Sequence, residues 1–207
     1  MNPFRLLTEK PWLRTPQTAG GLTVEASQAS LTPPQKVALR VFLGVVAVLF
    51  GLFFTAYFIR MSLADWQPMP EPQQLWFNTL LLVLGSVALQ WTSHVIRNGQ
   101  AGLMKIGLFL ATLLTFGFVF GQVTVWEQMS AAGYYLYNNP ANSFFYVLTA
   151  VHALHMLGGL WVLTKAGFRV LTGAEPEKIR LSIELCTTYW HFLLLVWLAV
   201  FALISYT

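Results

Sequence analysis

The sequence predicts an all-α, polytopic membrane protein, and two observations carry that prediction. Of the 207 residues, 56% are hydrophobic and only 10% are charged, whereas about 25% of the residues in soluble domains are charged. Five apolar segments of 22 to 24 residues are each long enough to cross a ~30 Å hydrocarbon core as a helix. None shows the alternating polarity of barrel strands. We therefore expect a bundle of five transmembrane helices.

The polar stretch 1–36 is predicted to be a cytoplasmic N-terminal tail. Five prolines interrupt it, at Pro3, Pro11, Pro16, Pro33 and Pro34. No short apolar core precedes a small-residue cleavage site, so no cleaved signal peptide is predicted. The transmembrane domain then covers residues 37–207, with spans at 37–59, 75–96, 103–126, 143–164 and 183–206.

The distribution of positive charge predicts the orientation. Eleven of the twelve Lys and Arg residues lie in or near the tail, the second connection and the fourth connection, which share one side of a five-helix bundle. Arg60 alone lies on the other side. The positive-inside rule then makes the N terminus cytoplasmic and the C terminus periplasmic, with connection 127–142 outside. Because the basic residues flank apolar segments, we read them as topology signals and predict no nucleic-acid partner.

Ionisable side chains inside the spans are the candidate site residues, because they are costly in hydrocarbon and mark protein-facing or functional positions. His152 and His155 lie three residues apart in the fourth span, so they share a helix face. His191 lies in the fifth span. If these two spans are antiparallel neighbours, His155 and His191 lie at nearly equal depth and form a facing pair.

Three interpretations of this histidine pair are open: axial ligation of a haem, a proton relay, and hydrogen bonding that organises helices or lipid. Hydrogen bonds between membrane helices contribute about 0.6 kcal/mol each. We favour this structural interpretation, because the sequence has no second histidine pair to carry electrons across the bilayer.

Glu184 opens the fifth span and shares a helix face with His191. A carboxylate is favoured there by the helix dipole. We expect it to pair with Lys165, Arg180 or a lipid headgroup, with a place in a proton path as the alternative.

Pairs of glycines predict close helix packing. Gly117 and Gly121 form a small-xxx-small pair in the third span, and Gly158 and Gly159 narrow the fourth span beside the histidines. The sequence has no phosphate loop, no nucleophile paired with a base, no metal-ligand spacing and a single cysteine. We therefore predict no catalytic residue, no metal ligand and no redox cofactor in this chain.

Several segments resemble one family. Gly121-Gln122, Trp126 and the stretch 131–160 (AAGYYLYNNPANSFFYVLTAVHALHMLGGL) are similar to the central region of haem–copper oxidase subunit III, the cytochrome c oxidase subunit 3 family. Segment 183–201 resembles that family's final helix, in which a Glu precedes a Tyr-Trp-His triplet, matched here by Glu184 and residues 189–191. Segments 49–61 and 75–91 resemble earlier helices. The resemblance covers roughly 37–207 and corresponds to the short five-helix bacterial form.

The resemblance implies a non-redox subunit of a proton-pumping terminal oxidase, which reduces oxygen to water with electrons from cytochrome c or quinol. Haem and copper then belong to subunits I and II. Subunit III packs on subunit I, binds phospholipid, and supports proton uptake and stability during turnover. The implied location is the inner, cytoplasmic membrane of a bacterium. One departure is that the acid common midway along the family's corresponding helix is absent here, near Val46.

Two other functions remain as alternatives. An accessory subunit of a nitric oxide reductase shares the five-helix pattern. A small-solute transporter would need a polar lining along several helices, and the first two spans contain almost no polar residues.

Overall fold

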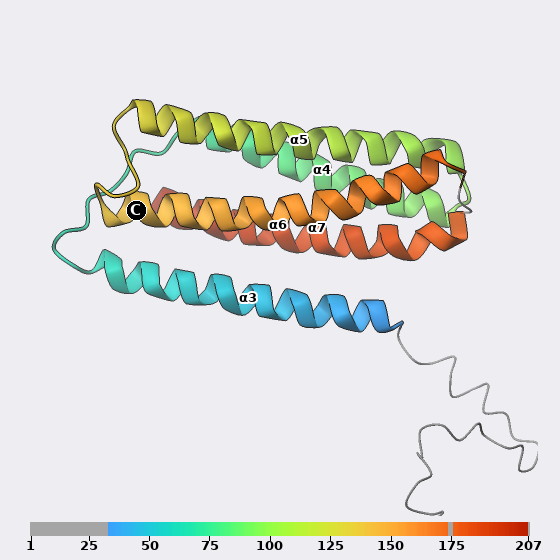
Figure 1. Ribbon diagram of the computed structural model, residues 1–207, viewed down its shortest axis with the longest axis horizontal. Helices are drawn as coiled ribbons and strands as arrows, with labels where there is room; N and C mark the ends of the chain where they lie inside the picture. Colours follow the sequence, from blue (N-terminus) through green and yellow to red (C-terminus); the bar gives the residue numbers. More distant parts are fainter. Residues whose placement is uncertain (1–32, 174–175, 207) are drawn as a thin grey trace, which may run out of the picture. The chain divides into compact units, whose positions relative to one another are not determined.

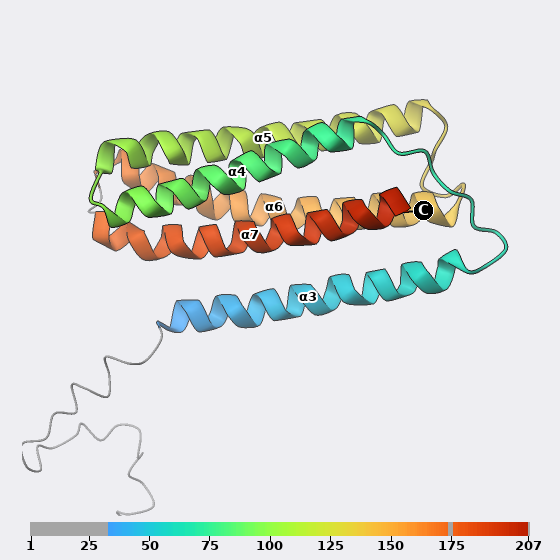
Figure 2. The same ribbon diagram turned by 180° about the vertical axis from the view of Figure 1, so that it is seen from behind.

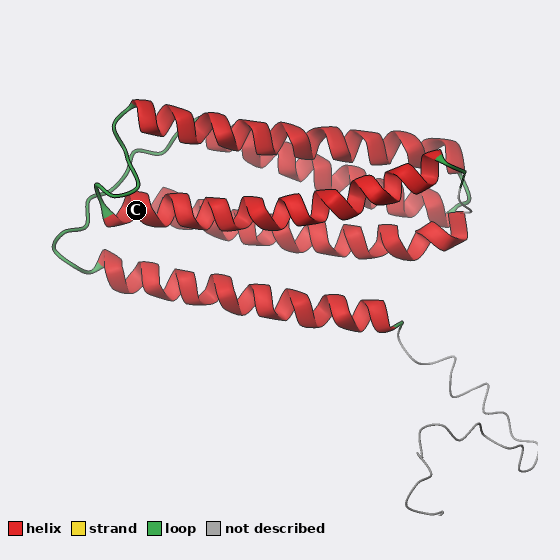
Figure 3. Cartoon of the chain, in the orientation of Figure 1, coloured by secondary structure: helices red, strands yellow, loops and turns green. Residues whose placement is uncertain are grey.

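The residues that the structure describes fold into five long helices. The computed structural model describes residues 33–173 and 176–206 (Figure 1), so most of the predicted tail 1–36 lies outside the described residues. The helices are α3 (Pro34–Met61), α4 (Gln74–Arg97), α5 (Ala101–Ala131), α6 (Pro140–Leu171) and α7 (Pro176–Tyr206). Over the described residues the chain contains helices and loops and no strand (Figure 3). All five helices are long and apolar enough to span a membrane, so the predicted class is confirmed.

The helices extend beyond the predicted apolar segments. The connection predicted at 127–142 shrinks to residues 132–139, because α5 continues to Ala131 and α6 already begins at Pro140. The side chain of Asn139 accepts a hydrogen bond from the backbone of Ala141 and caps α6, and Pro140 occupies its first turn, where a missing N–H has no consequence. Hydropathy marks the lipid-facing part of a helix, whereas capping decides where the helix ends.

Helices α4 to α7 form a four-helix bundle, in which α4 packs on α5 and α7, and α6 packs on α5 and α7. Helix α3 runs beside α6 and α7, outside this bundle, in both views of the chain (Figure 2). Aromatic side chains make much of its contact with the rest. The ring of Tyr57 lies 5.3 Å from that of Phe144, and the ring of Phe50 lies 5.9 Å from that of His155.

Tryptophans fill the interior of the bundle and satisfy their indole N–H groups there. Trp190 and Trp197 on α7 are both buried. Trp190 donates to the hydroxyl of Thr115 at 3.3 Å, and Trp197 donates to the hydroxyl of Thr79 at 2.9 Å. These bonds join α7 to α5 and to α4, so each large ring both fills space and fixes the register of two helices.

Arg60, in the last turn of α3, pairs with an acid of the connection that follows. Arg60 donates two hydrogen bonds to the carboxylate of Asp65. These bonds hold the pKa of Asp65 below its usual value.

Further along the chain, Gly133 follows the end of α5 with a φ of 86°, a conformation that a residue with a Cβ rarely adopts.

Candidate functional site

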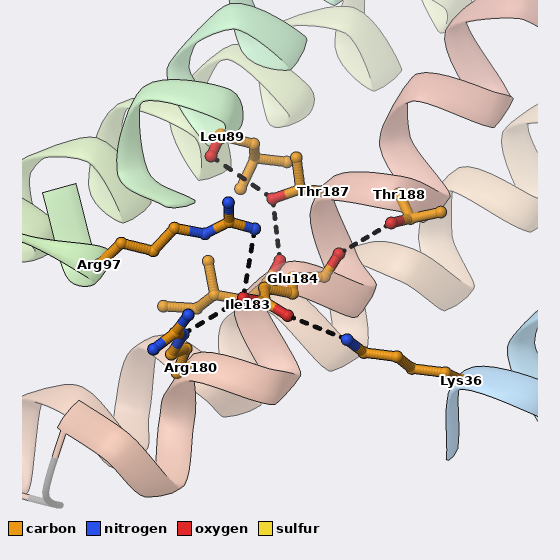
Figure 4. Close-up of polar contacts among 8 residues, drawn as sticks. All are labelled: Lys36, Leu89, Arg97, Arg180, Ile183, Glu184, Thr187 and Thr188. Atoms are coloured by element: carbon orange, nitrogen blue, oxygen red, sulfur yellow. Dashed lines mark hydrogen bonds and ion pairs between the residues drawn. The ribbon is translucent and has the colours of Figure 1, made fainter. Parts of the chain in front are cut away.

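Glu184 is the centre of an ionic cluster to which three helices contribute. Its carboxylate lies 3.3 Å from the ammonium of Lys36 on α3, 3.3 Å from the guanidinium of Arg97 on α4, and 3.3 Å from that of Arg180 on α7 (Figure 4). We call these four residues the Glu184 cluster. The side chain of Glu184 is 17% exposed, whereas the cations are 37% to 54% exposed.

The cluster arises from the ends of the helices. Arg180 precedes Glu184 by one helical turn, Arg97 is the last residue of α4, and Lys36 lies in the first turn of α3. Three cations around one carboxylate leave a net positive charge at this end of the helices. The expected pairing with Lys165 is wrong: Lys165 is exposed, because Leu163 and Ala166 occupy the buried face of α6 at that level.

A groove of about 300 Å³ opens beside the cluster, between α3 and the α4–α7 pair. Its polar lining is Lys36, Arg40, Gln90, Ser93, Arg97, Glu184, Thr187, Thr188 and His191. We call it the polar groove. Thr188 donates its hydroxyl to the backbone oxygen of Glu184 at 3.0 Å, so that hydroxyl is tied to α7 itself.

His191 belongs to the polar groove and bonds to α4. Its Nδ1 is hydrogen-bonded to the hydroxyl of Ser86, and its Nε2 lies 3.0 Å from the amide oxygen of Gln90. Ser86, Gln90, Ser93 and Arg97 are spaced four, three and four residues apart, so they lie on one face of α4. Sequence reasoning missed this stripe, although its spacing is visible in the sequence.

His155 has other partners, so the predicted facing pair with His191 does not form. Its Nδ1 lies 2.7 Å from the backbone oxygen of Val151, and its ring packs beside Phe50 on α3. The predicted level is nevertheless right, since Tyr189, two residues before His191, donates its hydroxyl to the backbone oxygen of His155 at 2.9 Å. Equal depth does not determine how each helix is rotated, and the two rings face different neighbours.

His152 is fully buried inside the four-helix bundle. Its ring lies edge-on to Phe118, with centroids 5.8 Å apart, and 5.1 Å from the ring of Trp197. Neither ring nitrogen has a hydrogen-bond partner among the described residues. Although it shares a helix with His155, it lies in the interior of the bundle and away from α3.

The four glycines for which the sequence predicts close helix packing differ in their surroundings. A Cβ on Gly121 would lie 2.2 Å from the amide oxygen of Asn78, and a Cβ on Gly159 would lie 2.6 Å from the ring of Tyr189. A Cβ on Gly117 would make an ordinary contact with Leu81, at 3.4 Å. Beside Gly158 there is open space, because this residue lines a second groove.

That second groove, of about 380 Å³, is apolar and adjoins the polar groove. Its lining is Leu39, Phe42, Gly158, Gly159, Val162, Leu185, Cys186, Tyr189 and Trp190. Leu39 and Leu185 line both grooves, so the apolar groove, on the α6 side of α7, and the polar groove, on its α4 side, share a wall. Within the described part of the chain, no three His, Cys, Asp or Glu residues are grouped as metal ligands.

The fold and this lining define a multi-pass membrane protein with a charged groove at one end of its helices. A family model described as cytochrome c oxidase subunit III matches residues 6–207, so the chain belongs to that family. It is 27% identical to a probable cytochrome c oxidase subunit 3 of Mycobacterium bovis, over 90% of this chain and 95% of that one. It is 26% identical to a probable subunit 3 of Nocardia farcinica, over 86% and 91%. It is also 26% identical to the cytochrome c oxidase subunit 3 of the antelope Tragelaphus imberbis, over 83% and 70%.

Family membership confirms the resemblance seen in the sequence. The chain is a subunit III of a haem–copper oxidase, a non-redox subunit, and it associates with other subunits of the oxidase in a membrane.

Proposed function

We propose that this chain packs on subunit I of a proton-pumping terminal oxidase of a bacterial inner membrane, whose subunits I and II hold the haem and copper. In that complex it binds an anionic phospholipid and thereby supports proton uptake and stability during turnover. The cluster and its groove are the lipid site, with Glu184, Arg180 and His191 in its wall. His152 and His155 organise the helices around it.

The observation that carries the lipid part is that a charged groove and an apolar groove adjoin and share Leu39 and Leu185. The polar groove holds Lys36, Arg40 and Arg97 against a single carboxylate, so it favours an anionic group. The adjoining apolar groove lies along α6 and α7. A phosphate in the polar groove and an acyl chain in the apolar groove match the two chemistries of a phospholipid.

The supporting role in proton uptake rests on packing rather than on a carboxylate of α3. Val46 occupies the position near which the family commonly has an acid, and it is buried. Helix α3 as a whole contains no Asp or Glu. In this chain, then, support for proton uptake comes from the lipid and from the contact with subunit I.

Substitution of Arg97 tests the lipid assignment. In Arg97→Gln the polar groove loses one cation while the side chain keeps much of its length, so we expect less phospholipid in the purified oxidase complex. Oxygen reduction should begin at the normal rate and inactivate sooner. Lys165→Gln is the matched control, because Lys165 is exposed outside the groove.

The measurement is phospholipid phosphorus per complex, together with oxygen consumption over many turnovers. Unchanged lipid content in Arg97→Gln would remove the lipid assignment. Equal lipid loss in Lys165→Gln would show a general effect of surface charge.

A further inference from the structure

A polar layer crosses the interior of the four-helix bundle, away from the Glu184 cluster. It consists of Asn78 on α4, Gln122 on α5 and His152 on α6, each at most 1% exposed. The amide of Asn78 donates to the amide oxygen of Gln122 at 3.3 Å. Nothing in the proposed lipid site uses these three side chains.

The helix registers bring the three residues to one level. Trp126 on α5 donates to the hydroxyl of Thr149 on α6, and one turn along each of these antiparallel helices lie Gln122 and His152. From α7, Trp197 packs its ring 5.1 Å from that of His152 and donates to Thr79, the neighbour of Asn78. The layer therefore surrounds Trp197, with Phe118 closing one side of His152.

The layer holds hydrogen-bonding groups that the described residues leave unpaired. These are the amide oxygen of Asn78, the amide nitrogen of Gln122 and both ring nitrogens of His152. Rotating both amides by 180° exchanges their roles and still leaves one donor and one acceptor. A neutral imidazole adds one donor and one acceptor. Such groups are rare in protein interiors because burying them unpaired is costly.

We propose that this layer is a binding site for buried water, which bridges His152 to the Asn78–Gln122 amide pair. One water molecule can donate to the amide oxygen, accept from the amide nitrogen and bond to one ring nitrogen of His152, and buried waters typically make about three hydrogen bonds. Gly121 is part of the site, because a Cβ there would lie 2.2 Å from the amide oxygen of Asn78 and would displace the amide. The water joins α4, α5 and α6 through one polar centre.

An experimental structure of the whole oxidase, at a resolution that shows ordered water, is the direct test. We expect density about 2.7–3.2 Å from a ring nitrogen of His152 and from the amide of Asn78 or Gln122. A direct hydrogen bond between His152 and either amide, with no water, would overturn the proposal.

A double-mutant cycle tests the same bridge in solution. His152→Phe and Gln122→Leu should each lower the midpoint of thermal unfolding of the complex, and the second substitution should lower it less once the first is present. The matched control pairs Gln122→Leu with His155→Phe, whose shifts should add, because His155 bonds to its own helix. Additive shifts for His152 and Gln122 would contradict a shared water. If His152→Phe prevents assembly, His152→Gln takes its place, and it should retain the water density and most of the stability.

Discussion

At the scale of single residues, the roles of His191 and His155 are explained by their immediate partners rather than by their depth. His191 bonds to Ser86 and Gln90 on the neighbouring helix, whereas His155 bonds to Val151 in its own helix. The two histidines lie near the same level and serve different contacts. Removing either one therefore affects different partners.

Replacement of His191 by Leu should weaken the contact between α4 and α7 without removing a metal. Hydrogen bonds between membrane helices contribute ~0.6 kcal/mol on average and at most ~1.7 kcal/mol, so we expect a modest fall in thermal stability. His155→Leu should have a smaller effect, because its ring bonds within one helix. Measuring both variants and the double variant checks this prediction: their effects should add. Loss of one haem or metal in His191→Leu would refute the structural interpretation.

At the scale of helices, close packing depends on which of two adjacent glycines faces the neighbour. Gly159 lies against Tyr189 and Trp190, whereas Gly158 has open space beside it. Trp190 is buried, so its ring has little freedom to yield.

Gly159→Ala should therefore destabilise the contact between α6 and α7 by about 1–3 kcal/mol, the usual cost of overpacking. Gly158→Ala is the control one residue away, and we expect no loss of stability from it, because a Cβ there has open space and alanine favours a helix over glycine. Thermal unfolding of the purified complex measures both. If Gly159→Ala is as stable as Gly158→Ala, the close approach of α6 to α7 at Gly159 does not limit this contact, and the prediction is wrong.

The existence of all five helices could be predicted from apolar length, but their ends and rotations could not. Hydropathy indicated a break near residue 127, yet α5 continues to Ala131, since polar residues remain helical at headgroup depth. The Glu184 cluster was predicted only in part. Arg180 lies one turn from Glu184 in the sequence, whereas Lys36 and Arg97 are 148 and 87 residues away and are brought to it by folding. The spacing of the polar stripe on α4 is visible in the sequence. Whether His191 faces that stripe depends on the rotation of α7, which the sequence does not give.

At the scale of the whole molecule, the orientation in the membrane stays a prediction of the charge distribution. A cysteine at Tyr137, which is 82% exposed, should react with an impermeant maleimide added outside the cell. A cysteine at Thr172, at the opposite ends of the helices, should react only after permeabilisation. The background for both is Cys186→Ala, since Cys186 is the one natural cysteine. The reverse labelling pattern would overturn the orientation.

Removal of the whole subunit from the oxidase should leave the haem spectrum intact. Oxygen reduction should begin normally and decline as turnover proceeds, if the chain has the supporting, non-redox role proposed above. A reduced-minus-oxidised spectrum and a time course of oxygen consumption test this. A missing haem band in the depleted complex would show that this chain supplies a ligand.

The width of the apolar groove and the charge of the polar groove depend on different residues of α3 and its neighbours. Phe42 on α3 lines the apolar groove and packs beside Tyr189 on α7, with ring centroids 6.2 Å apart, so its ring limits the width of that groove. The charge of the polar groove is set elsewhere, by Lys36 and Arg97. A substitution can therefore change the width of the apolar groove without changing the charge of the polar groove, and the reverse also holds. If the two grooves hold a phospholipid as proposed, a smaller residue at position 42 should admit a bulkier acyl chain without altering the preference for an anionic headgroup.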